Sequence, residues 1–293
     1  MSNYHIKHLE EYFQVYRKSV NQPEAFWEEI AEENFMWRKK WDTVLEWDFS
    51  KPAVKWFKGA KLNITENCID RHLLTRGEQT AILFEPNDPN EPAEHITYKQ
   101  LSVRVNKFAN VLKSKGIQKG DRVCIYLPMI PELSIALLAC ARIGAIHSVV
   151  FAGFSATALA TRINDSDCKM VITSDGSFRG NKTIDLKGIV DEAMDSCTCV
   201  ESVLVVKRIN SEIQMKSGRD FWIAPLLEKA SDACEIEIMD AEDPLFMQIA
   251  MRHCWLKYYA CRVISMYLSS LSLLIFAPLN QRLKYYKQRW HCS

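Results

Sequence analysis

The chain has 293 residues, of which 48% are hydrophobic and 25% are charged, and its net charge is +1. At about 150 residues per domain, this length is enough for roughly two domains with a substantial core. The composition excludes the disordered and fibrous classes, and the balanced charge provides no field that would attract nucleic acid. Ten cysteines without a CxxC pair indicate reduced thiols in a cytoplasmic protein, with no disulfide framework and no metal site. The first residues lack an apolar h-region, so we expect no signal peptide.

The first predicted region, residues 9–58, is rich in aromatic side chains and is expected to be helical. Its rings include Trp27, Trp37, Trp41 and Trp56. Large aromatic side chains usually bury themselves in a core, so we interpret them as packing groups and not as a ligand cage.

Strand and helix patterns alternate from about residue 80 onward. Thr97 and Gln100 have the spacing of a capping box at a helix start, and Gly116 stands where that helix should end. The apolar runs between helices are continuous, as expected for strands of a parallel sheet covered on both faces. We therefore predict an α/β fold, a partial doubly wound parallel sheet with helices on both faces, preceded by the aromatic-rich helical region. The predicted strands are 80–84, 94–97, 122–127, 147–151, 170–174 and 202–206, and the predicted helices are 98–115, 131–143, 156–164 and 186–194.

Two loops are candidate binding sites. Residues 151–155 follow a strand, Gly153 allows close approach of a ligand, and Ser155 is placed to cap the next helix. The second loop, Arg179-Gly180-Asn181-Lys182, carries two cations three residues apart, a spacing suited to phosphate. The alternatives are an ordinary strand-to-helix turn and a solvated basic loop.

Common catalytic motifs are missing from the sequence. It has no G-x-G-x-x-G, G-x4-G-K-[ST], H-E-x-x-H or G-x-S-x-G pattern. His147 lies in an apolar strand and is interpreted as a core histidine. We therefore assign no catalytic residue.

Several long segments, in the right order, resemble the N-terminal part of acetyl-coenzyme A synthetases, members of the adenylate-forming acyl-CoA synthetase superfamily. The resemblance covers residues from about 9 to 246. The segments that carry it are 11–16, 26–27, 55–73, 96–98, 119–123, 126–132 and 141–155.

The resemblance implies an acetate–CoA ligase that converts ATP, acetate and coenzyme A into acetyl-CoA, AMP and pyrophosphate through acetyl-AMP, with Mg²⁺. It also implies that the loop at Arg179, Gly180, Asn181 and Lys182 holds the 3′-phosphate ADP end of coenzyme A, although the family usually has Arg-x-Gly-Arg there. Gly153 resembles a position that lines the pantetheine tunnel.

The composition changes after residue 246. Residues 247–293 contain seven Lys or Arg but no Asp, Glu or Gly. The Ser/Thr/Gly-rich phosphate loop, the adenine motif and the catalytic lysine of the family have no counterpart there. We expect three parts: an N-terminal region (1–75), an incomplete adenylation domain (76–246) and an aberrant basic tail (247–293). The whole would be a truncated, inactive synthetase.

Two alternatives remain open. The chain is either a non-catalytic module that binds coenzyme A or a partner, or a fragment anchored in a membrane by residues 263–281. That uncharged run contains several polar side chains, which makes insertion marginal.

Overall fold

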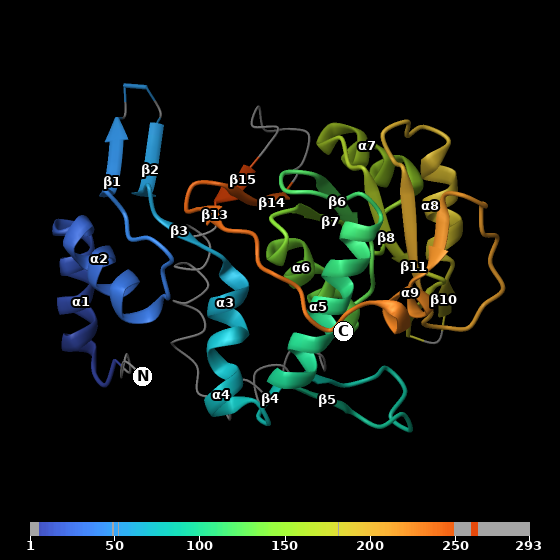
Figure 1. Cartoon of the computed structure of the whole chain (residues 1–293), viewed down its shortest axis with the longest axis horizontal. Helices are drawn as coiled ribbons and strands as arrows, with labels where there is room; N and C mark the ends of the chain where they lie inside the picture. The colour runs from blue at the N-terminus through green and yellow to red at the C-terminus, as the bar shows by residue number, and fades with distance from the viewer. Residues whose placement is uncertain (1–5, 49, 52, 181, 249–258, 263–293) are drawn as a thin grey trace. The chain divides into compact units, whose positions relative to one another are not determined.

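The computed structural model describes residues 6–48, 50–51, 53–180, 182–248 and 259–262 (Figure 1). The chain divides into two compact units. The first contains the described residues up to Leu62 together with Asp240–Asp243, and the second contains Asn63–Met239 and the strand that starts at Pro244.

The first unit contains two helices and a strand hairpin. Helices α1 (Leu9–Asn21) and α2 (Pro23–Asn34) are followed by the antiparallel strands β1 (Thr43–Asp48) and β2 (Ala53–Lys58), and by β3 (Lys61–Leu62). The prediction that residues 9–58 are helical throughout was therefore wrong after Asn34, where α2 ends, and the chain forms strands from Thr43 onward. β-branched and aromatic side chains favour the pleated strand there, and an Asp48 side chain that accepts the Ser50 N–H at 2.9 Å helps the chain to turn.

The aromatic rings of this unit pack on one another. Phe57 is fully buried, and the rings of Trp37 and Trp41 lie 5.6 and 5.0 Å from it. No ligand cage is needed to explain these rings. Helix α1 differs, because the Tyr12 and Tyr16 rings on it are 44% and 53% exposed.

The second unit is built on a sheet with the strand order β12-β11-β8-β6-β7-β14-β15. The six strands from β12 to β14 are parallel to their neighbours, which confirms the predicted fold class. The strands are β6 (Arg122–Ile125), β7 (Ile146–Val149), β8 (Met170–Ser174), β11 (Ser202–Val206), β12 (Asp220–Trp222), β14 (Pro244–Gln248) and β15 (Tyr259–Arg262).

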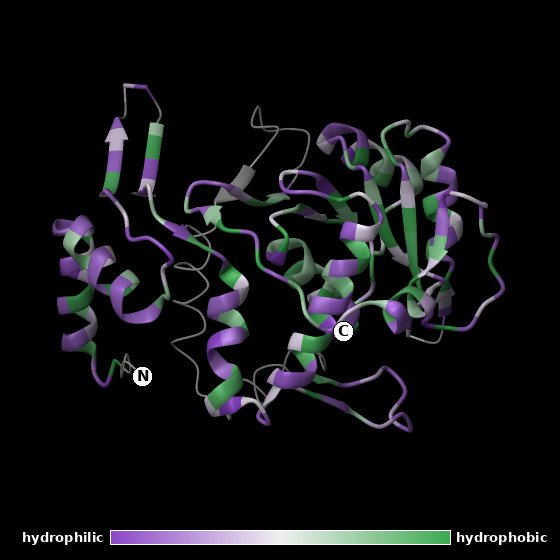
Figure 2. Cartoon of the chain, in the orientation of Figure 1, coloured by the Kyte–Doolittle hydropathy of each residue, from purple (hydrophilic) through white to green (hydrophobic). Residues whose placement is uncertain are grey.

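Helices cover both faces of this sheet (Figure 1). Helices α5 (Tyr98–Ser114), α6 (Pro131–Arg142) and α9 (Ile223–Lys229) share one buried cluster with Val123 and Ile172 of the strands. Helices α7 (Ala156–Ser166) and α8 (Leu186–Met194) share a second cluster with Cys124 and Val171. Adjacent strand residues thus enter opposite cores, which explains why apolar residues follow one another directly in these strands and do not alternate with polar ones (Figure 2).

Several predicted elements are confirmed at the residue level. The hairpin β4 (Thr80–Phe84) and β5 (Glu94–Thr97) has the predicted bounds, as do β8, α8 and β11. The capping box is present, since Thr97 accepts the Gln100 N–H and Gln100 accepts the Thr97 N–H at 2.9 Å. Gly116 has φ +84°, a conformation that favours glycine at a helix end.

The remaining elements were not predicted individually. They are α3 (Ile64–Cys68), the 3-10 turn η1 (Asp70–His72), α4 (Leu73–Arg76), β9 (Ser177–Arg179), β10 (Lys182–Ile184) and β13 (Met239–Asp240).

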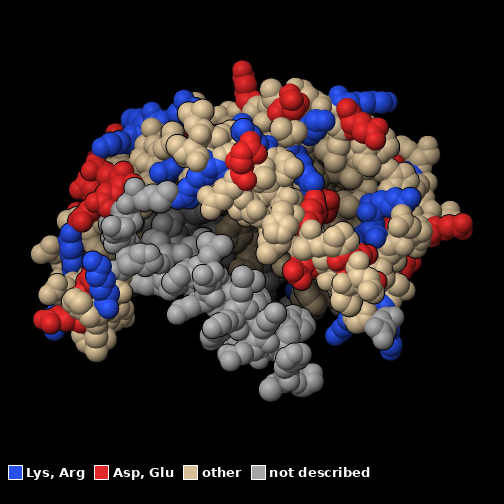
Figure 3. Space-filling model, turned by 90° about the horizontal axis from the view of Figure 1, so that it is seen from below, with Lys and Arg blue, Asp and Glu red and all other residues tan. Residues whose placement is uncertain are grey.

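Among the residues that the structure describes, no helix is long and apolar enough to span a membrane. The run 263–281 considered as an anchor lies outside the described residues. On the face seen in Figure 3, acidic and basic side chains are interspersed.

Candidate coenzyme-binding edge of the sheet

The two candidate loops lie at one edge of the sheet. Because β6, β7, β8 and β11 are parallel, the loops that follow them all leave from the same side, here called the carboxyl edge. Gly153 follows β7, and Arg179 follows β8. Ligands of open α/β sheets usually bind at this edge, which makes it the candidate site.

The basic loop is a two-stranded hairpin, β9–β10. In its register Arg179 stands directly opposite Lys182, so the two cationic side chains lie on the same face of the hairpin. Both are exposed, and Gly180 adopts φ +58° in the turn. Asn181 lies outside the described residues.

No carboxylate that the structure describes neutralises this pair of cations. Within the described ranges, neither Arg179 nor Lys182 forms an ion pair with a carboxylate. Like charges placed opposite each other in a hairpin repel and are destabilising unless an anion lies between them. The geometry therefore suits a phosphate group, which accepts hydrogen bonds from a guanidinium and an ammonium group.

Two side-chain hydrogen bonds, one from within the loop and one from the segment after β6, fix the loop that contains Gly153. Ser155 caps α7 by accepting the Ala158 N–H at 3.4 Å, as predicted. The Tyr126 hydroxyl donates to the Phe154 carbonyl at 2.8 Å, and burial raises the pKa of Tyr126 to about 12, so it stays a donor.

A side chain at Gly153 would clash with the Phe151 ring unless that ring moved. A Cβ atom there would lie 2.4 Å from Cε1 of Phe151, whose ring is 68% exposed. The absence of a side chain lets an exposed aromatic ring fold over the loop backbone. The rings of Phe151 and Phe154 meet edge to face, with their centroids 5.9 Å apart. This loop therefore presents an apolar surface at the carboxyl edge of the sheet.

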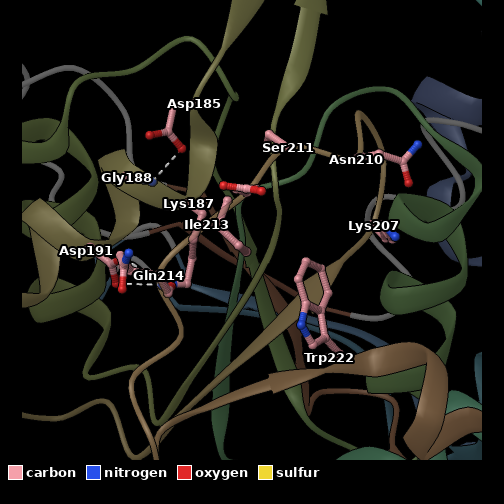
Figure 4. A pocket seen from close by; sticks show the side chains of 11 residues that line it. Asp185, Lys187, Gly188, Asp191, Lys207, Asn210, Ser211, Ile213, Gln214 and Trp222 are labelled. Carbon is pink, nitrogen blue, oxygen red and sulfur yellow. Dashed lines mark hydrogen bonds and ion pairs between the residues drawn. The ribbon is translucent and has the colours of Figure 1, made fainter.

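A polar hollow of about 760 Å³ lies beside α8. Sequence reasoning missed it, because its walls come from α8, the loop after β11 and the end of β12. Figure 4 shows Asp185 turned to the Gly188 N–H and Lys187 beside Asp191. Its lining residues are Asp185, Lys187, Gly188, Asp191, Lys207, Asn210, Ser211, Glu212, Ile213, Gln214 and Trp222.

Two lining residues of this hollow, Lys187 and Asp191, belong to a group of four charged side chains that neutralise one another. Lys187, 1% exposed, donates to Asp191 at 2.7 Å and to Asp220 at 2.8 Å. Arg219 contacts the same two carboxylates, each at 2.5 Å. Burial alone would raise the pKa of Asp220, but the hydrogen bonds from Arg219 and Lys187 outweigh it and lower that pKa. This four-residue group, the α8 charge cluster, is a structural network rather than a ligand site.

His147 lies in the interior of β7. It is 9% exposed and stacks on Phe246 with the ring centroids 5.6 Å apart. Burial lowers its pKa to about 4, so the imidazole is neutral at pH 7. The interpretation as a core histidine is confirmed, but its hydrogen bonding is not satisfied: Nδ1 is buried and has no hydrogen-bond partner among the described residues.

The cysteines described by the structure are all unpaired. Burial raises the pKa of Cys124 and that of Cys140, so both remain thiols at neutral pH. Over the described ranges, no group of three or more His, Cys, Asp or Glu side chains is placed to hold a metal ion.

The parallel sheet with helices on both faces defines a doubly wound α/β protein, and comparison with known proteins identifies the family. Residues 69–248 match the model of the AMP-binding enzyme family, and residues 12–68 match that of the acetyl-coenzyme A synthetase N-terminus. The chain belongs to the AMP-binding enzyme family, and its matched part corresponds to the N-terminal part of acetyl-coenzyme A synthetases. The resemblance found in the sequence is thus confirmed.

Individual relatives agree with this assignment. An acetyl-coenzyme A synthetase of Magnetococcus marinus is 52% identical over 238 residues, which are 81% of this chain and 37% of that protein. Acetyl-coenzyme A synthetase 2 of Pseudomonas aeruginosa is also 52% identical, with the same coverage of both chains. A solved acetoacetyl-CoA synthetase of Streptomyces lividans superposes with a TM-score of 0.72 at 26% identity, covering 80% of this chain and 35% of its own. The chain thus spans little more than a third of the length of the relatives it matches.

Proposed function

We propose that this chain carries part of an acetate–CoA ligase, the activity in which ATP, acetate and coenzyme A give acetyl-CoA, AMP and pyrophosphate through acetyl-AMP. The observation that supports it most is 52% identity to acetyl-coenzyme A synthetases over 238 residues. Reduced thiols throughout the described part fit a cytoplasmic location.

Within that activity, we assign the β9–β10 hairpin to coenzyme A. Arg179 and Lys182 would donate to the 3′-phosphate of the nucleotide, with Gly180 in the turn between them. Asn181, which the resemblance assigns to the same coenzyme A loop, lies outside the described residues. The paired, unneutralised cations support this assignment. Gly153, in the apolar loop at the same edge, would line the path of the pantetheine arm.

The adenylation step, in which acetyl-AMP forms from ATP and acetate, is not assigned to this chain. In this class of chemistry the largest catalytic contribution is stabilisation of the transferred phosphate charge. Residues 247–253 read Met-Gln-Ile-Ala-Met-Arg-His and contain none of the Ser, Thr or Gly residues of a phosphate loop. The match to the family model ends at residue 248. We therefore propose that the chain as printed does not form acetyl-AMP, and we assign none of its residues to Mg²⁺.

A second candidate follows from the same observation. A chain that keeps the hairpin but lacks the phosphate loop would act as a module that binds coenzyme A without catalysis. Both candidates predict that this chain releases no pyrophosphate from ATP in the presence of acetate. Release above the rate of a protein-free control would overturn the proposal that this chain is inactive.

Binding of coenzyme A tests the hairpin directly. Titration calorimetry of the full chain with coenzyme A and with dephospho-coenzyme A should show weak binding, on the order of millimolar, that favours coenzyme A and weakens with salt. Arg179→Ala should remove the preference, whereas Lys229→Ala, an exposed cation on α9, should keep it. Equal affinity of the unmodified chain for the two ligands would contradict the assignment.

A further inference from the structure

The hairpin that carries Arg179 and Lys182 is fixed at its base by one buried carboxylate. Asp175 directly follows β8 and is fully buried. Its Oδ1 accepts the N–H groups of Gly176 at 2.9 Å, Arg208 at 2.7 Å and Ile209 at 3.1 Å. A single oxygen therefore joins the start of the hairpin to the loop that follows β11.

The packing around this carboxylate leaves no slack. A Cβ atom on Gly176 would lie 2.3 Å from Cδ1 of Ile209 and 2.8 Å from the carbonyl oxygen of Ile184. Ile184 is the last residue of the hairpin and stands opposite Ser177 at its base. In the described part of the chain, Oδ2 of Asp175 is buried and has no hydrogen-bond partner. A buried carboxylate oxygen without a partner carries a desolvation cost.

The back face of the hairpin is held by a guanidinium group. Arg208, whose side chain is only 18% exposed, lies over the rings of Phe178 at 5.5 Å and Phe84 at 5.7 Å. Phe178 precedes Arg179 in β9, and successive strand residues point to opposite faces. Arg208 therefore supports the face opposite to that of Arg179 and Lys182, while its own backbone N–H is bound by Asp175.

We infer that Asp175 and Arg208, together called the hairpin clamp, are positioning residues for recognition of the coenzyme A 3′-phosphate, an inference that rests on the proposed function. Asp175 sets where the hairpin leaves the sheet, and Arg208 sets its tilt. Two cations on a short, otherwise free hairpin would spread apart by repulsion. When the clamp holds the hairpin, both cations point to one phosphate. The preference for coenzyme A over dephospho-coenzyme A therefore depends on residues that do not contact either ligand.

The test compares the ratio of the two dissociation constants, dephospho-coenzyme A over coenzyme A, in variants of the full chain. The unmodified chain should show a ratio of about ten. Asp175→Ala and Arg208→Gln should lower it to about two, the first by freeing three N–H groups and the second by removing the stack on Phe178. Asp175→Asn keeps an oxygen that can accept those N–H groups and should restore much of the ratio.

A matched control separates positioning from general stability. Asp121 is also a buried aspartate that accepts a backbone N–H, from Gln118 at 2.9 Å, but it lies at the start of β6, away from the carboxyl edge. Asp121→Asn should lower stability and leave the ratio at about ten. An unchanged ratio in both Arg208→Gln and a folded Asp175 variant would overturn the clamp.

Hydrogen exchange keeps the two hypotheses distinguishable. Amides of residues 176–184 should exchange faster in Asp175→Ala and Arg208→Gln than in the unmodified chain or in Asp121→Asn. If the unmodified chain binds both ligands equally, the proposed function fails, and the ligand-recognition role of the clamp fails with it. Unchanged exchange together with a preserved preference for coenzyme A would overturn the clamp alone.

Discussion

Replacement of Lys187 by Met should strongly destabilise the second unit. The Lys187 side chain is 1% exposed and that of Asp220 is 0% exposed, so the ammonium group neutralises a carboxylate that water does not reach. Lys187 also donates to the Gln214 carbonyl at 3.0 Å, which holds the loop after β11. Methionine fills a similar volume but leaves these acceptors without their donor.

The size of the expected loss of stability depends on the contacts that the remaining charged residues keep in the variant. Removing one partner of a buried ion pair costs about 3–5 kcal/mol. Arg219 still contacts Asp191 and Asp220 in the variant, so we expect the lower end, about 3 kcal/mol. Urea unfolding at pH 7, followed by tryptophan fluorescence and circular dichroism, measures the loss. Lys99→Met, which breaks the exposed ion pair with Glu78, is the control and should be neutral within error. A loss below about 1 kcal/mol for Lys187→Met would refute the view that the α8 charge cluster stabilises this unit.

Three other outcomes are expected. The pKa of His147 is about 4 in the folded chain, below its usual 6.5. On acidification, the unfolded chain therefore binds a proton at His147 at a higher pH than the folded chain does. Stability should fall by about 1.4 kcal/mol per pH unit between pH 6.5 and 4, and His147→Gln should flatten that slope in urea titrations at several pH values. Gly153→Ala should displace the exposed Phe151 ring and weaken coenzyme A binding by calorimetry, with the free energy of unfolding changed by no more than about 0.5 kcal/mol, because that ring has room to move. Thr97→Ala removes the acceptor for the Gln100 N–H at the start of α5 and should cost about 1 kcal/mol in urea unfolding; an unchanged midpoint would show that the capping box is dispensable.

The sequence by itself determined the elements whose signals are local. Strands β8 and β11 contain the apolar runs 170–172 and 203–206 because each strand enters two cores. Such a run can be recognised in the sequence without knowing which core receives which residue. The start of α5 was predictable because a capping box involves only Thr97 and Gln100, three residues apart. The family could also be recognised, since long matching segments need no geometry.

Only the tertiary structure decided the relations between distant segments. The residue types of 43–58 favour a strand, but the strand forms only because β1 pairs with β2, which no local pattern specifies. Arg179 and Lys182 could be seen as two cations in a loop, but the antiparallel register placed them opposite each other on one face. Asp175 carries no local signal, because the N–H groups of Arg208 and Ile209 that it binds lie more than thirty residues further along the chain. Contacts of this kind arise when parallel strands bring their following loops to one edge, and the spacing of residues along the chain does not encode them.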